Sequence, residues 1–438
     1  MRTAIIGLGI TGFSCVRYLQ ASDELVVVDT RKSPPFVEEV RLRFPAIELQ
    51  LGVQNFDFAG VDRVIVSPGI ALDSCLVRAA GSEIALLSDI DLFCAAAEQP
   101  VVAITGTNGK STVTSLVAHL RNHAGHATAV GGNLGEPALD LLDESAAAYV
   151  IELSSFQLER VHSHRFAAAS ILNLSEDHLD RHGDMAGYIA SKHRIYRNCE
   201  LAVAFRDDPR TYPGSSVDKL VTFGSDEPTR GQWGIRDVSG TRYLACGAEC
   251  VVASAELPIA GRHNELNVLA AFALLADSGI PMSDLARGAR SFVGLPHRCQ
   301  RVAEVAGVAY INDSKATNVG ATLAAIEGFA ERDSQRLILI AGGDGKGMDF
   351  APLQKPVEKF VKAVILLGQD ADKIAATLIN VVAVYRVGDM AEAVARAADV
   401  AAPGDLVLLS PACASLDMYE NFAARGEEFA RHARGLAV

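Results

Sequence analysis

The stretch AITGTNGKSTVTSL, which runs from Ala103 to Leu116, decides the fold of this chain. It contains the end of the apolar run VVAIT and opens a helical pattern, so it predicts a buried strand, a glycine turn and a helix. The turn fits the phosphate-loop pattern G-x-x-x-x-G-K-[ST], except that Ile104 stands where the pattern has its first glycine. A loop without that glycine binds a nucleotide only if its other parts are present.

Those parts are present in the turn and in the first helical residues. Backbone N–H groups of such a turn converge on phosphate oxygens, a lysine brings a positive charge to the β- and γ-phosphates, and a Ser or Thr hydroxyl holds Mg²⁺. The start of the helix adds the positive end of its dipole. The alternative is a structural glycine turn with a surface lysine. We predict a nucleotide-phosphate site formed by Gly106, Thr107, Asn108, Gly109, Lys110, Ser111 and Thr112.

Short apolar runs that end in glycine-rich turns recur along the chain. At about 150 residues per domain, 438 residues predict roughly three domains. Val- and Ile-rich runs that alternate with helical patterns predict parallel sheets, with ligands at the carboxyl ends of the strands. The predicted strands lie in TAIIGLG, ELVVVDT, RVIVSPG, VVAITGTNG, AYVIELSS, AASILNLSEDH, RLILIAGGDG, AVILLGQD and DLVLLSPACAS.

Two linker-like segments divide the chain. AAAEQP precedes Val101, and FVGLPHRCQRV lies near residue 295. The predicted fold is α/β with a Rossmann-like domain at 1–88, a central P-loop ATPase-like domain at 89–294 and a Rossmann-like domain at 295–438. In residues 200–262, apolar and polar residues alternate and turn-forming residues are frequent. This pattern predicts a small β-rich insertion in the central domain.

The composition excludes some classes of function. A formal net charge of -13 argues against nucleic-acid binding, although local loops can still hold a small anionic substrate. No uninterrupted apolar stretch reaches about 18 residues, so no membrane span or membrane partner is expected. The eight scattered cysteines form no disulfide framework, which indicates a reducing, cytoplasmic location.

The N-terminal run IIGLGITG is a second candidate phosphate site. Gly7, Gly9 and Gly12 form G-x-G-x-x-G after a strand, and Asp29 ends the next strand. This is the dinucleotide-binding pattern, in which glycines let the backbone approach a diphosphate at a helix N-terminus. NAD and a UDP-sugar both carry such a diphosphate, so the pattern does not choose between them. A purely structural tight turn is the alternative.

A carboxylate and a histidine follow two central strands. Glu152 ends a probable buried strand, where a carboxylate is costly unless it is paired or binds a metal. Because Mg²⁺ takes few carboxylates together with phosphate oxygens, we interpret Glu152 as a metal ligand rather than a core ion pair. His178, in NLSEDHLDRHGD, is placed to contact a second Mg²⁺ or a phosphate. His182 is predicted to lie on the surface, since a zinc site needs more ligands than this stretch offers.

Other polar residues are less specific. Asn264 and Asn267 are three residues apart and share a helix face, where amides pair with a base edge or cap the helix. Lys192 has the spacing of a solvated helix lysine, and the residues around it assign it no role. Arg298, Lys315 and Lys346 place cations on predicted loops, which suits a carboxylate or a phosphate as well as solvent.

Taken together, these segments resemble the Mur ligase family, the ATP-dependent amide ligases of peptidoglycan precursor synthesis. GTNGKST, ELSSFQLE, HNELN, LPHR and NDSKATN occur in the family's order, and the likeness covers essentially the whole chain. The family shares G-T-N-G-K-[ST], so Ile104 is no defect. GLGITG, SPGIA and SPACASLDMYENFAARGEEF resemble the branch that adds D-glutamate. The family's aromatic after DHLDR is missing, and Glu265 lies at a position that the family varies.

The resemblance implies an ATP-dependent reaction. ATP phosphorylates the L-alanyl carboxylate of UDP-N-acetylmuramoyl-L-alanine, and the amine of D-glutamate attacks the acyl phosphate and releases phosphate. ATP, Mg²⁺ and a carbamylated Lys192 are the expected cofactors, and the chain is expected to act as a cytoplasmic monomer. The implied catalytic residues are Lys110, Glu152, His178 and Lys192.

The resemblance also implies a role for further residues. Ser111 and Glu152 would hold one Mg²⁺, and His178 with carbamylated Lys192 a second. Beside the phosphate loop, the ATP residues would be Asn264, Asn267, Arg298 and Asp313. The UDP-substrate residues would be Gly9, Ile10, Thr11, Asp29, Thr30, Arg31, Gly69, Asn133 and Ser154. The D-glutamate residues would be Thr317, Lys346, Ser415 and Phe422.

Other functions remain open at this point. An NAD-dependent oxidoreductase fused to an ATPase would bind nicotinamide at Gly7–Gly12. A nucleotide-gated binding protein would leave Glu152, His178 and Lys192 without a reason to follow separate strands and helices. Within the family, the nearest rival adds glutamate to folate, but it would not need the first glycine-rich unit.

Overall fold

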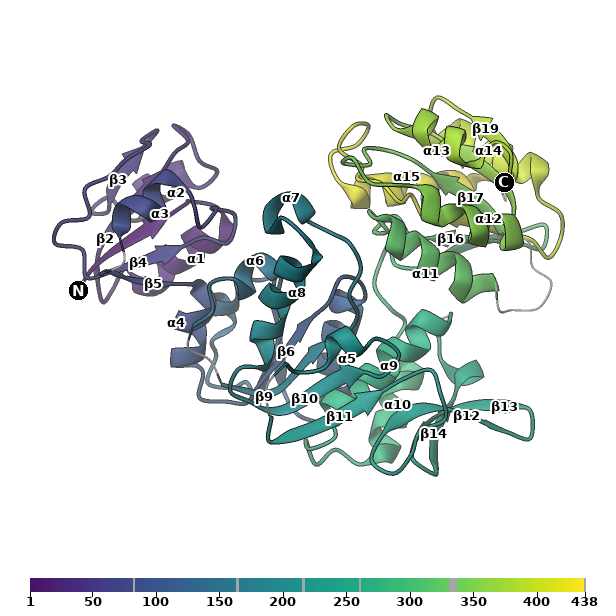
Figure 1. Ribbon diagram of the computed structural model, residues 1–438, viewed down its shortest axis with the longest axis horizontal. Coiled ribbons are helices and arrows are strands. Elements are labelled where there is room, and N and C mark those ends of the chain that lie inside the picture. Colours follow the sequence, from purple (N-terminus) through teal and green to yellow (C-terminus); the bar gives the residue numbers. More distant parts are fainter. Residues whose placement is uncertain (82, 163–164, 215–216, 260, 331–336, 437–438) are drawn as a thin grey trace.

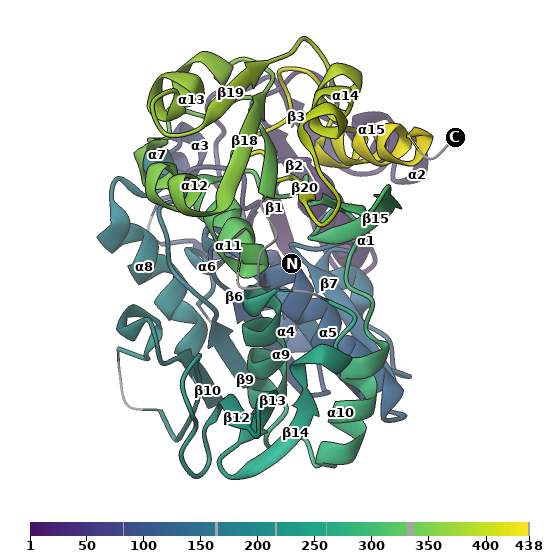
Figure 2. The same cartoon turned by 90° about the vertical axis from the view of Figure 1, so that its right-hand side faces the viewer.

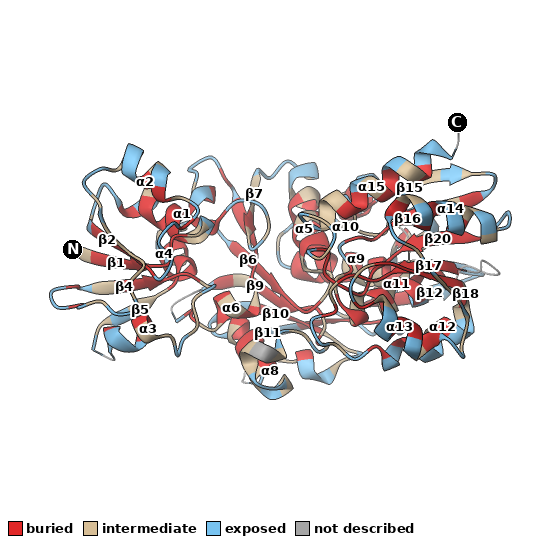
Figure 3. Cartoon of the chain, turned by 90° about the horizontal axis from the view of Figure 1, so that it is seen from above, coloured by how far each residue is buried: buried red, intermediate tan, exposed pale blue. Residues whose placement is uncertain are grey.

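Buried parallel strands organise the chain into three α/β units that follow one another along the sequence (Figure 1). The structure is a computed structural model that describes residues 1–81, 83–162, 165–214, 217–259, 261–330 and 337–436. The inner strands of each sheet are buried along most of their length, whereas edge strands and the outer faces of helices are exposed (Figure 3). Each apolar run singled out in the sequence is a strand, which confirms the predicted α/β class.

The N-terminal unit has the strand order β3-β2-β1-β4-β5, and its strands pair in parallel. Its first glycine turn follows the central strand of that order, so it opens at the middle of the sheet edge. The elements are β1 (Arg2–Ile6), α1 (Ile10–Leu19), β2 (Glu24–Asp29), α2 (Val37–Arg43), β3 (Glu48–Leu51), β4 (Arg63–Val66), α3 (Cys75–Ala80) and β5 (Ala85–Leu87).

The central unit has the strand order β14-β13-β12-β11-β10-β9-β6-β8-β7. Its first half comprises α4 (Asp89–Ala96), β6 (Val101–Thr105), α5 (Lys110–His123), β7 (Thr128–Gly132), β8 (Ala148–Glu152), α6 (Ser155–Leu158), β9 (Phe166–Ile171), α7 (Leu179–His182) and α8 (Met185–His193). Its second half comprises β10 (Cys199–Phe205), β11 (Lys219–Phe223), β12 (Trp233–Val238), β13 (Thr241–Cys246), β14 (Glu249–Ala253), α9 (Arg262–Leu274) and α10 (Met282–Ser291).

Two features of the central sheet matter for the site. Strand β6 lies between β8 and β9, so the phosphate loop has the ends of β8 and β9 on its two sides. The predicted β-rich segment is present and continues the same sheet: β10 and β11 pair in parallel, and β12, β13 and β14 pair antiparallel. Helix α9 packs against α5 and covers these strands.

The C-terminal unit has the strand order β15-β16-β20-β17-β18-β19, parallel except for the β15–β16 pair. Strand β20 lies between β16 and β17, which brings the loops after these strands together. The elements are β15 (Gln300–Val305), β16 (Val308–Asn312), α11 (Val319–Ala330), β17 (Leu337–Ala341), α12 (Gln354–Phe360), β18 (Val361–Leu366), α13 (Ala371–Leu378), β19 (Ala383–Arg386), α14 (Met390–Val400), β20 (Leu406–Leu409) and α15 (Phe422–Gly435).

The outer units lie on either side of the central one (Figure 1), and the quarter-turn view shows the C-terminal strands above the central sheet (Figure 2). Within the described ranges, none of the helices combines the length and the apolar character that crossing a bilayer would require.

The glycines of the N-terminal turn differ in what surrounds them, and this predicts a difference in stability. A Cβ at Gly12 would overlap the carbonyl oxygen of Gly7, whereas no other heavy atom lies within 4 Å of a Cβ at Gly9. Gly12→Ala should lower the free energy of unfolding of this unit by about 1–3 kcal/mol, the usual cost of overpacking. Gly9→Ala, the matched control, should change it by less than about 0.5 kcal/mol. Denaturant titration measures both, and equal effects would contradict the tight turn.

Candidate active site

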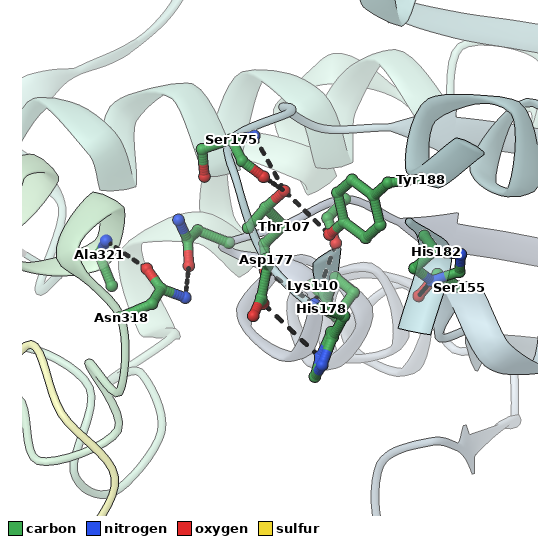
Figure 4. Close-up of polar contacts among 12 residues, drawn as sticks. Thr107, Lys110, Ser155, Ser175, Asp177, His178, His182, Tyr188, Asn318 and Ala321 are labelled. Atoms are coloured by element: carbon green, nitrogen blue, oxygen red, sulfur yellow. Dashed lines mark hydrogen bonds and ion pairs between the residues drawn. The ribbon is translucent and has the colours of Figure 1, made fainter. Parts of the chain in front are cut away.

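The segment that follows strand β9 holds the phosphate loop through hydrogen bonds. The Asn108 N–H donates to the Asn173 Oδ1 (2.9 Å), and the Asn173 Nδ2 donates to the Asn108 carbonyl (3.0 Å). The Thr107 N–H donates to the Asn173 carbonyl (3.0 Å), and its hydroxyl contacts Ser175 and the Tyr188 hydroxyl (Figure 4). The loop backbone is therefore held in place by protein groups alone, which leaves its outward N–H groups available to a phosphate.

Two lysine amines meet beneath this loop. The Lys110 Nζ donates to the carbonyls of Gly106 (3.0 Å) and Thr107 (2.8 Å). The Lys192 Nζ donates to the same Gly106 carbonyl (2.9 Å) and to the Thr105 hydroxyl (3.2 Å). Lys192 is only 1% exposed, although its spacing in the sequence is that of a solvent-facing helix lysine. Burial, and then the charge of Lys110, lowers the pKa of Lys192 well below its usual value, which favours a neutral amine.

Glu152 reaches the site from the end of β8 with one oxygen unsatisfied. It is 2% exposed; its Oε1 accepts from the Asn133 Nδ2 (2.7 Å), and its Oε2 is buried without a hydrogen-bond partner. A buried carboxylate oxygen without a partner is costly and fits a cation. Ser111, also buried, is the second residue of α5, the helix that packs against β8. These donors suit Mg²⁺, which completes its shell with phosphate oxygens and water.

A self-contained metal centre is not part of the site. Across the described ranges, no group of three or more His, Cys, Asp and Glu side chains lies close enough to hold a metal. A metal at Glu152 would thus depend on oxygen ligands from a bound nucleotide, as is usual for Mg²⁺ at phosphates.

The two histidines of the segment after β9 occupy different surroundings. His178 has a left-handed backbone (φ 54°), its side chain is 44% exposed, and its Nε2 lies 3.7 Å from the Asp177 carboxylate. His182 was predicted to lie on the surface, and this is wrong. Its side chain is 3% exposed and contacts Glu159 (3.1 Å) and Ser155 (3.0 Å). The short helix α7 turns the ring inward between Phe156 and Tyr188, which the spacing could not indicate.

A cavity of about 360 Å³ adjoins the phosphate loop between the central and C-terminal units. It brings together residues from separate sequence motifs: Asn108, Gly109, Thr112, Asn264, Asn267, Arg298 and Asp313. Apolar side chains of Leu172, Phe205 and Phe223 line it as well. An apolar pocket with a few amides and charges at the mouth of a phosphate loop has the chemistry of a nucleoside site.

The amides and the carboxylate of this cavity are held firmly. The Asn267 Nδ2 donates to the Asn264 Oδ1 (3.1 Å), and a Cβ at Gly109 would lie 2.6 Å from the Asn267 Oδ1, so helix α9 touches the loop where only glycine fits. Asp313 accepts from the Ser410 hydroxyl (2.9 Å) and from the Cys299 N–H (3.2 Å). Burial raises the pKa of Asp313 to about 7 despite these bonds.

Residues at the N-terminal glycine turn gather at the ends of β1, β2 and β4. Asp29 is 1% exposed and accepts from the Leu8 N–H (2.8 Å) and from the Arg31 guanidinium (2.7 Å). Burial alone would raise the pKa of Asp29, but these hydrogen bonds outweigh it and lower the pKa. Asp29 thus shapes the turn and orients Arg31. Around the same edge lie Gly9, Ile10, Thr11, Thr30 and Gly69.

Two further predicted substrate residues lie at the ends of β7 and β8. The Asn133 N–H donates to the Glu152 carbonyl (2.8 Å), in addition to the side-chain bond already described. The Ser154 hydroxyl caps α6 by accepting from the Gln157 N–H (3.2 Å). Both positions face the same strand ends as the phosphate loop.

The predicted D-glutamate residues come from three adjacent loops of the C-terminal unit. The loop that carries Lys346 is paired with the loop that carries Ser415, because Asp344 and Ala414 exchange backbone hydrogen bonds (3.1 and 2.8 Å). Arg425 is 3% exposed and donates to the carbonyls of residues 314, 413 and 414, which ties these loops to α15. Thr317 follows β16, and Phe422 begins α15.

Several site residues were not singled out in the sequence or were left without a role. Asn173 and Ser175 hold the phosphate loop, and His263 and Lys315 line the cavity. The Lys315 Nζ also lies 4.2 Å from the centre of the Phe422 ring. Asn173, Ser175 and Lys315 directly follow strands β9 and β16, so the rule that ligands lie at the carboxyl ends of parallel strands could have found them.

Family models match most of the chain. They are described as Mur ligase MurD-like, N-terminal domain (residues 1–86), Mur ligase middle domain (104–275) and Mur ligase, glutamate ligase domain (297–413). A Pseudomonas putida protein named UDP-N-acetylmuramoylalanine--D-glutamate ligase is 46% identical over 437 residues, covering 99% of this chain and 97% of the relative. A Marinobacter nauticus protein of the same name is 45% identical over 441 residues, covering 99% and 98%.

Solved structures share the fold at lower identity. A pseudomurein peptide ligase type C from Methanothermus fervidus has a TM-score of 0.62 at 18% identity, covering 99% of both chains. A UDP-N-acetylmuramate-alanine ligase from Thermotoga maritima has a TM-score of 0.60 at 19% identity, also covering 99% of both chains. These likenesses concern the three-domain architecture.

The cavity histidine predicts a pH dependence of stability. Burial lowers the pKa of His263 to about 4 from a usual value of about 6.5. As the pH falls, the unfolded chain binds a proton at His263 before the folded chain does. The contribution of the neutral ring to the free energy of unfolding is therefore fully present above about pH 6.5 and is lost as the pH falls toward 4. The loss at about pH 5 is about 2 kcal/mol, or about 4–8 °C in melting temperature. His263→Gln should reduce the change in melting temperature between about pH 7.5 and 5; an identical change in both proteins would contradict the buried neutral ring.

Proposed function

This chain belongs to the Mur ligase family, and on that premise we propose that it is the ligase that joins D-glutamate to UDP-N-acetylmuramoyl-L-alanine. One observation carries the proposal: relatives of that name are 45–46% identical over 99% of this chain. ATP is the energy source of the family, and the phosphate loop beside a nucleoside-sized cavity suits it. An NAD-dependent oxidoreductase is not favoured, since the likeness to ligases extends over the whole length.

The proposed reaction has two steps. The L-alanyl carboxylate attacks the γ-phosphorus of ATP, which forms an acyl phosphate and releases ADP. The free amine of D-glutamate then attacks the acyl carbon, and the tetrahedral intermediate collapses to the amide as phosphate leaves and the nitrogen gives up one of its two protons. Lys110 contributes by holding positive charge at the transferring phosphoryl group, where such groups act mainly by electrostatic stabilisation.

Mg²⁺ is part of the proposal because of the unsatisfied Glu152 oxygen. Glu152 and Ser111 would hold one ion, and His178 with a modified Lys192 a second; bound there, Mg²⁺ would neutralise charge on phosphate oxygens. Asn133 keeps the Glu152 carboxylate oriented through its bond to the other oxygen.

Carbamylation of Lys192, which the family resemblance implies, is part of the proposal, and the electrostatics of the site support it. A neutral buried amine attacks the carbon of CO₂ and loses a proton, which gives a carbamate with one negative charge. The lowered pKa of Lys192 supplies the neutral amine, and the neighbouring Lys110 supplies a counter-charge for the product. The carbamate would also give Lys192 oxygen atoms that could bind Mg²⁺.

The substrates divide between the outer units in this proposal. The UDP group is assigned to the N-terminal turn, and D-glutamate to the loops of Thr317, Lys346, Ser415 and Phe422. We take the domains as 1–88, 89–294 and 295–438, in keeping with the separate sheets. A cytoplasmic monomer without a membrane partner completes the proposal.

The carbamate is tested at Lys192. Lys192→Ala should lose nearly all turnover, because the site loses an anion that offsets the phosphate-loop cations. Bicarbonate or short carboxylic acids should partly restore activity to this variant by placing a carboxylate in the vacated space. Lys355→Ala, which removes an exposed lysine, is the matched control and should stay fully active. Full activity of Lys192→Ala without added acids would refute the role.

The proposed activity is tested by phosphate release with different amino acids. D-Glutamate, L-glutamate, meso-diaminopimelate and L-lysine are offered in parallel beside UDP-N-acetylmuramoyl-L-alanine and ATP. D-Glutamate should be strongly preferred, since inverting the centre displaces the amine or a carboxylate from its partners. Lys346→Ala should raise the KM for D-glutamate by at least about tenfold and leave that for ATP nearly unchanged, because a charge-assisted bond is lost. Preference for another amino acid would reject the assignment.

A further inference from the structure

Two asparagines from different units meet at the phosphate loop. The Asn318 Nδ2, at the start of α11, donates to the Asn108 Oδ1 at 3.4 Å. Figure 4 shows Asn318 beside α11 on the flank of the loop that carries Thr107. The distance is long for an amide hydrogen bond, so the contact is weak here and a small approach of the two units would strengthen it.

Each asparagine is anchored on its own side of this contact. The main chain of Asn108 is bonded in both directions to the Asn173 side chain (2.9 and 3.0 Å). The Asn318 Oδ1 accepts from the Ala321 N–H (2.8 Å) and so caps the first turn of α11. The Asn318 side chain cannot swing away without breaking its helix cap, and the main chain of Asn108 is fixed by Asn173, so the position of one loop constrains the other.

The first turn of α11 lies close against the nucleotide side of the contact. A Cβ at Gly320 would lie 3.0 Å from the Ser175 hydroxyl and 3.4 Å from the Asn108 Nδ2. A methyl group at Gly320 would be tight there, so the Ser175 hydroxyl and the Asn108 amide would have to move by a few tenths of an ångström.

The contact joins residues of two predicted binding sites, one for the nucleotide and one for D-glutamate. Asn108 belongs to the phosphate loop, and Asn318 directly follows Thr317 in the segment assigned to D-glutamate. We propose that Asn318 is a positioning residue that couples nucleotide at the phosphate loop to the D-glutamate site. This inference rests on the proposed function for the identity of the second substrate. By linkage, each substrate then raises the affinity of the protein for the other.

The first test replaces the donor and keeps the cap. Asn318→Ser retains a good helix cap but cannot reach Asn108, so the melting temperature should be unchanged. The KM for D-glutamate at saturating ATP should rise about fivefold, the usual size for one hydrogen bond, with kcat changed less than about twofold. In a double-mutant cycle with Asn108→Ala, the second substitution should add little to the first. Additive effects, or an unchanged KM, would overturn the proposal.

The second test wedges the contact. Gly320→Ala favours the helix, so stability should stay the same or rise, whereas the KM for D-glutamate should rise as the methyl group displaces the Asn108 amide from Asn318. Gly435→Ala in α15, where no other heavy atom lies within 4 Å of the added carbon, is the matched control: it carries the same helix preference and should leave the KM unchanged. A purely structural role for the contact would not separate stability from KM in this way, so parallel losses would count against coupling.

The third test does not depend on D-glutamate. Hydrogen exchange of the amides at 344–347, in the Lys346 loop outside the cavity lining, is followed with and without a non-hydrolysable ATP analogue. In the natural chain the analogue should slow this exchange, and in Asn318→Ser it should not. Equal protection in both proteins would overturn the coupling even if the ligase activity is confirmed. If instead the natural chain shows no turnover with D-glutamate, the proposed function fails and the exchange result still decides the role of Asn318.

Discussion

The carbonyl oxygen of Gly106 accepts from two lysine amines, and the rest of the site follows from that arrangement. Lys110 and Lys192 approach it to 3.0 and 2.9 Å. Two positive charges this close in a partly dry interior repel each other, and one of them is driven toward its neutral form. Glu152 and Asp177 offset part of this repulsion. A polyphosphate at the loop, or the carbamate proposed on Lys192, would offset more of it.

The strand order explains why these groups can meet at all. Strand β6 lies between β8 and β9. Glu152, with its unpartnered Oε2, therefore approaches the loop from one side, and Asn173, which bonds the loop backbone, approaches from the other. The C-terminal sheet repeats this logic, with β20 between β16 and β17, and Arg425 ties the three resulting loops together. In both units the parallel sheet fixes where the loops end, and a few buried polar bonds fix their shape.

The sequence predicted what depends on local pattern. Val- and Ile-rich runs showed the strands, and Gly109 with Lys110 showed the phosphate loop, because these features are written in neighbouring residues. Lys192 and His182 were missed by residue-level reasoning for the opposite reason. Each lies on a helix with ordinary spacing, and its burial is decided by elements far along the chain: the phosphate loop for Lys192, and Glu159 with Tyr188 for His182. The role of Lys192 was reached only through the family resemblance.

The contrast between the overall charge and the site charge has a physical consequence. The chain carries a formal net charge of -13, yet Lys110, Arg298 and Lys315 gather around one cavity or loop. Burial lowers the pKa of Lys110 and of Arg298, which shows that these cations are held where water screens them poorly. An anion that approaches this site therefore meets a locally positive, weakly screened field although the whole chain is acidic. Such a field favours a compact polyanion over a single carboxylate, so the nucleotide should bind at the phosphate loop before D-glutamate binds at the loops of the C-terminal unit. The Asn108–Asn318 contact lies between these two sites, where it can couple the first binding event to the second.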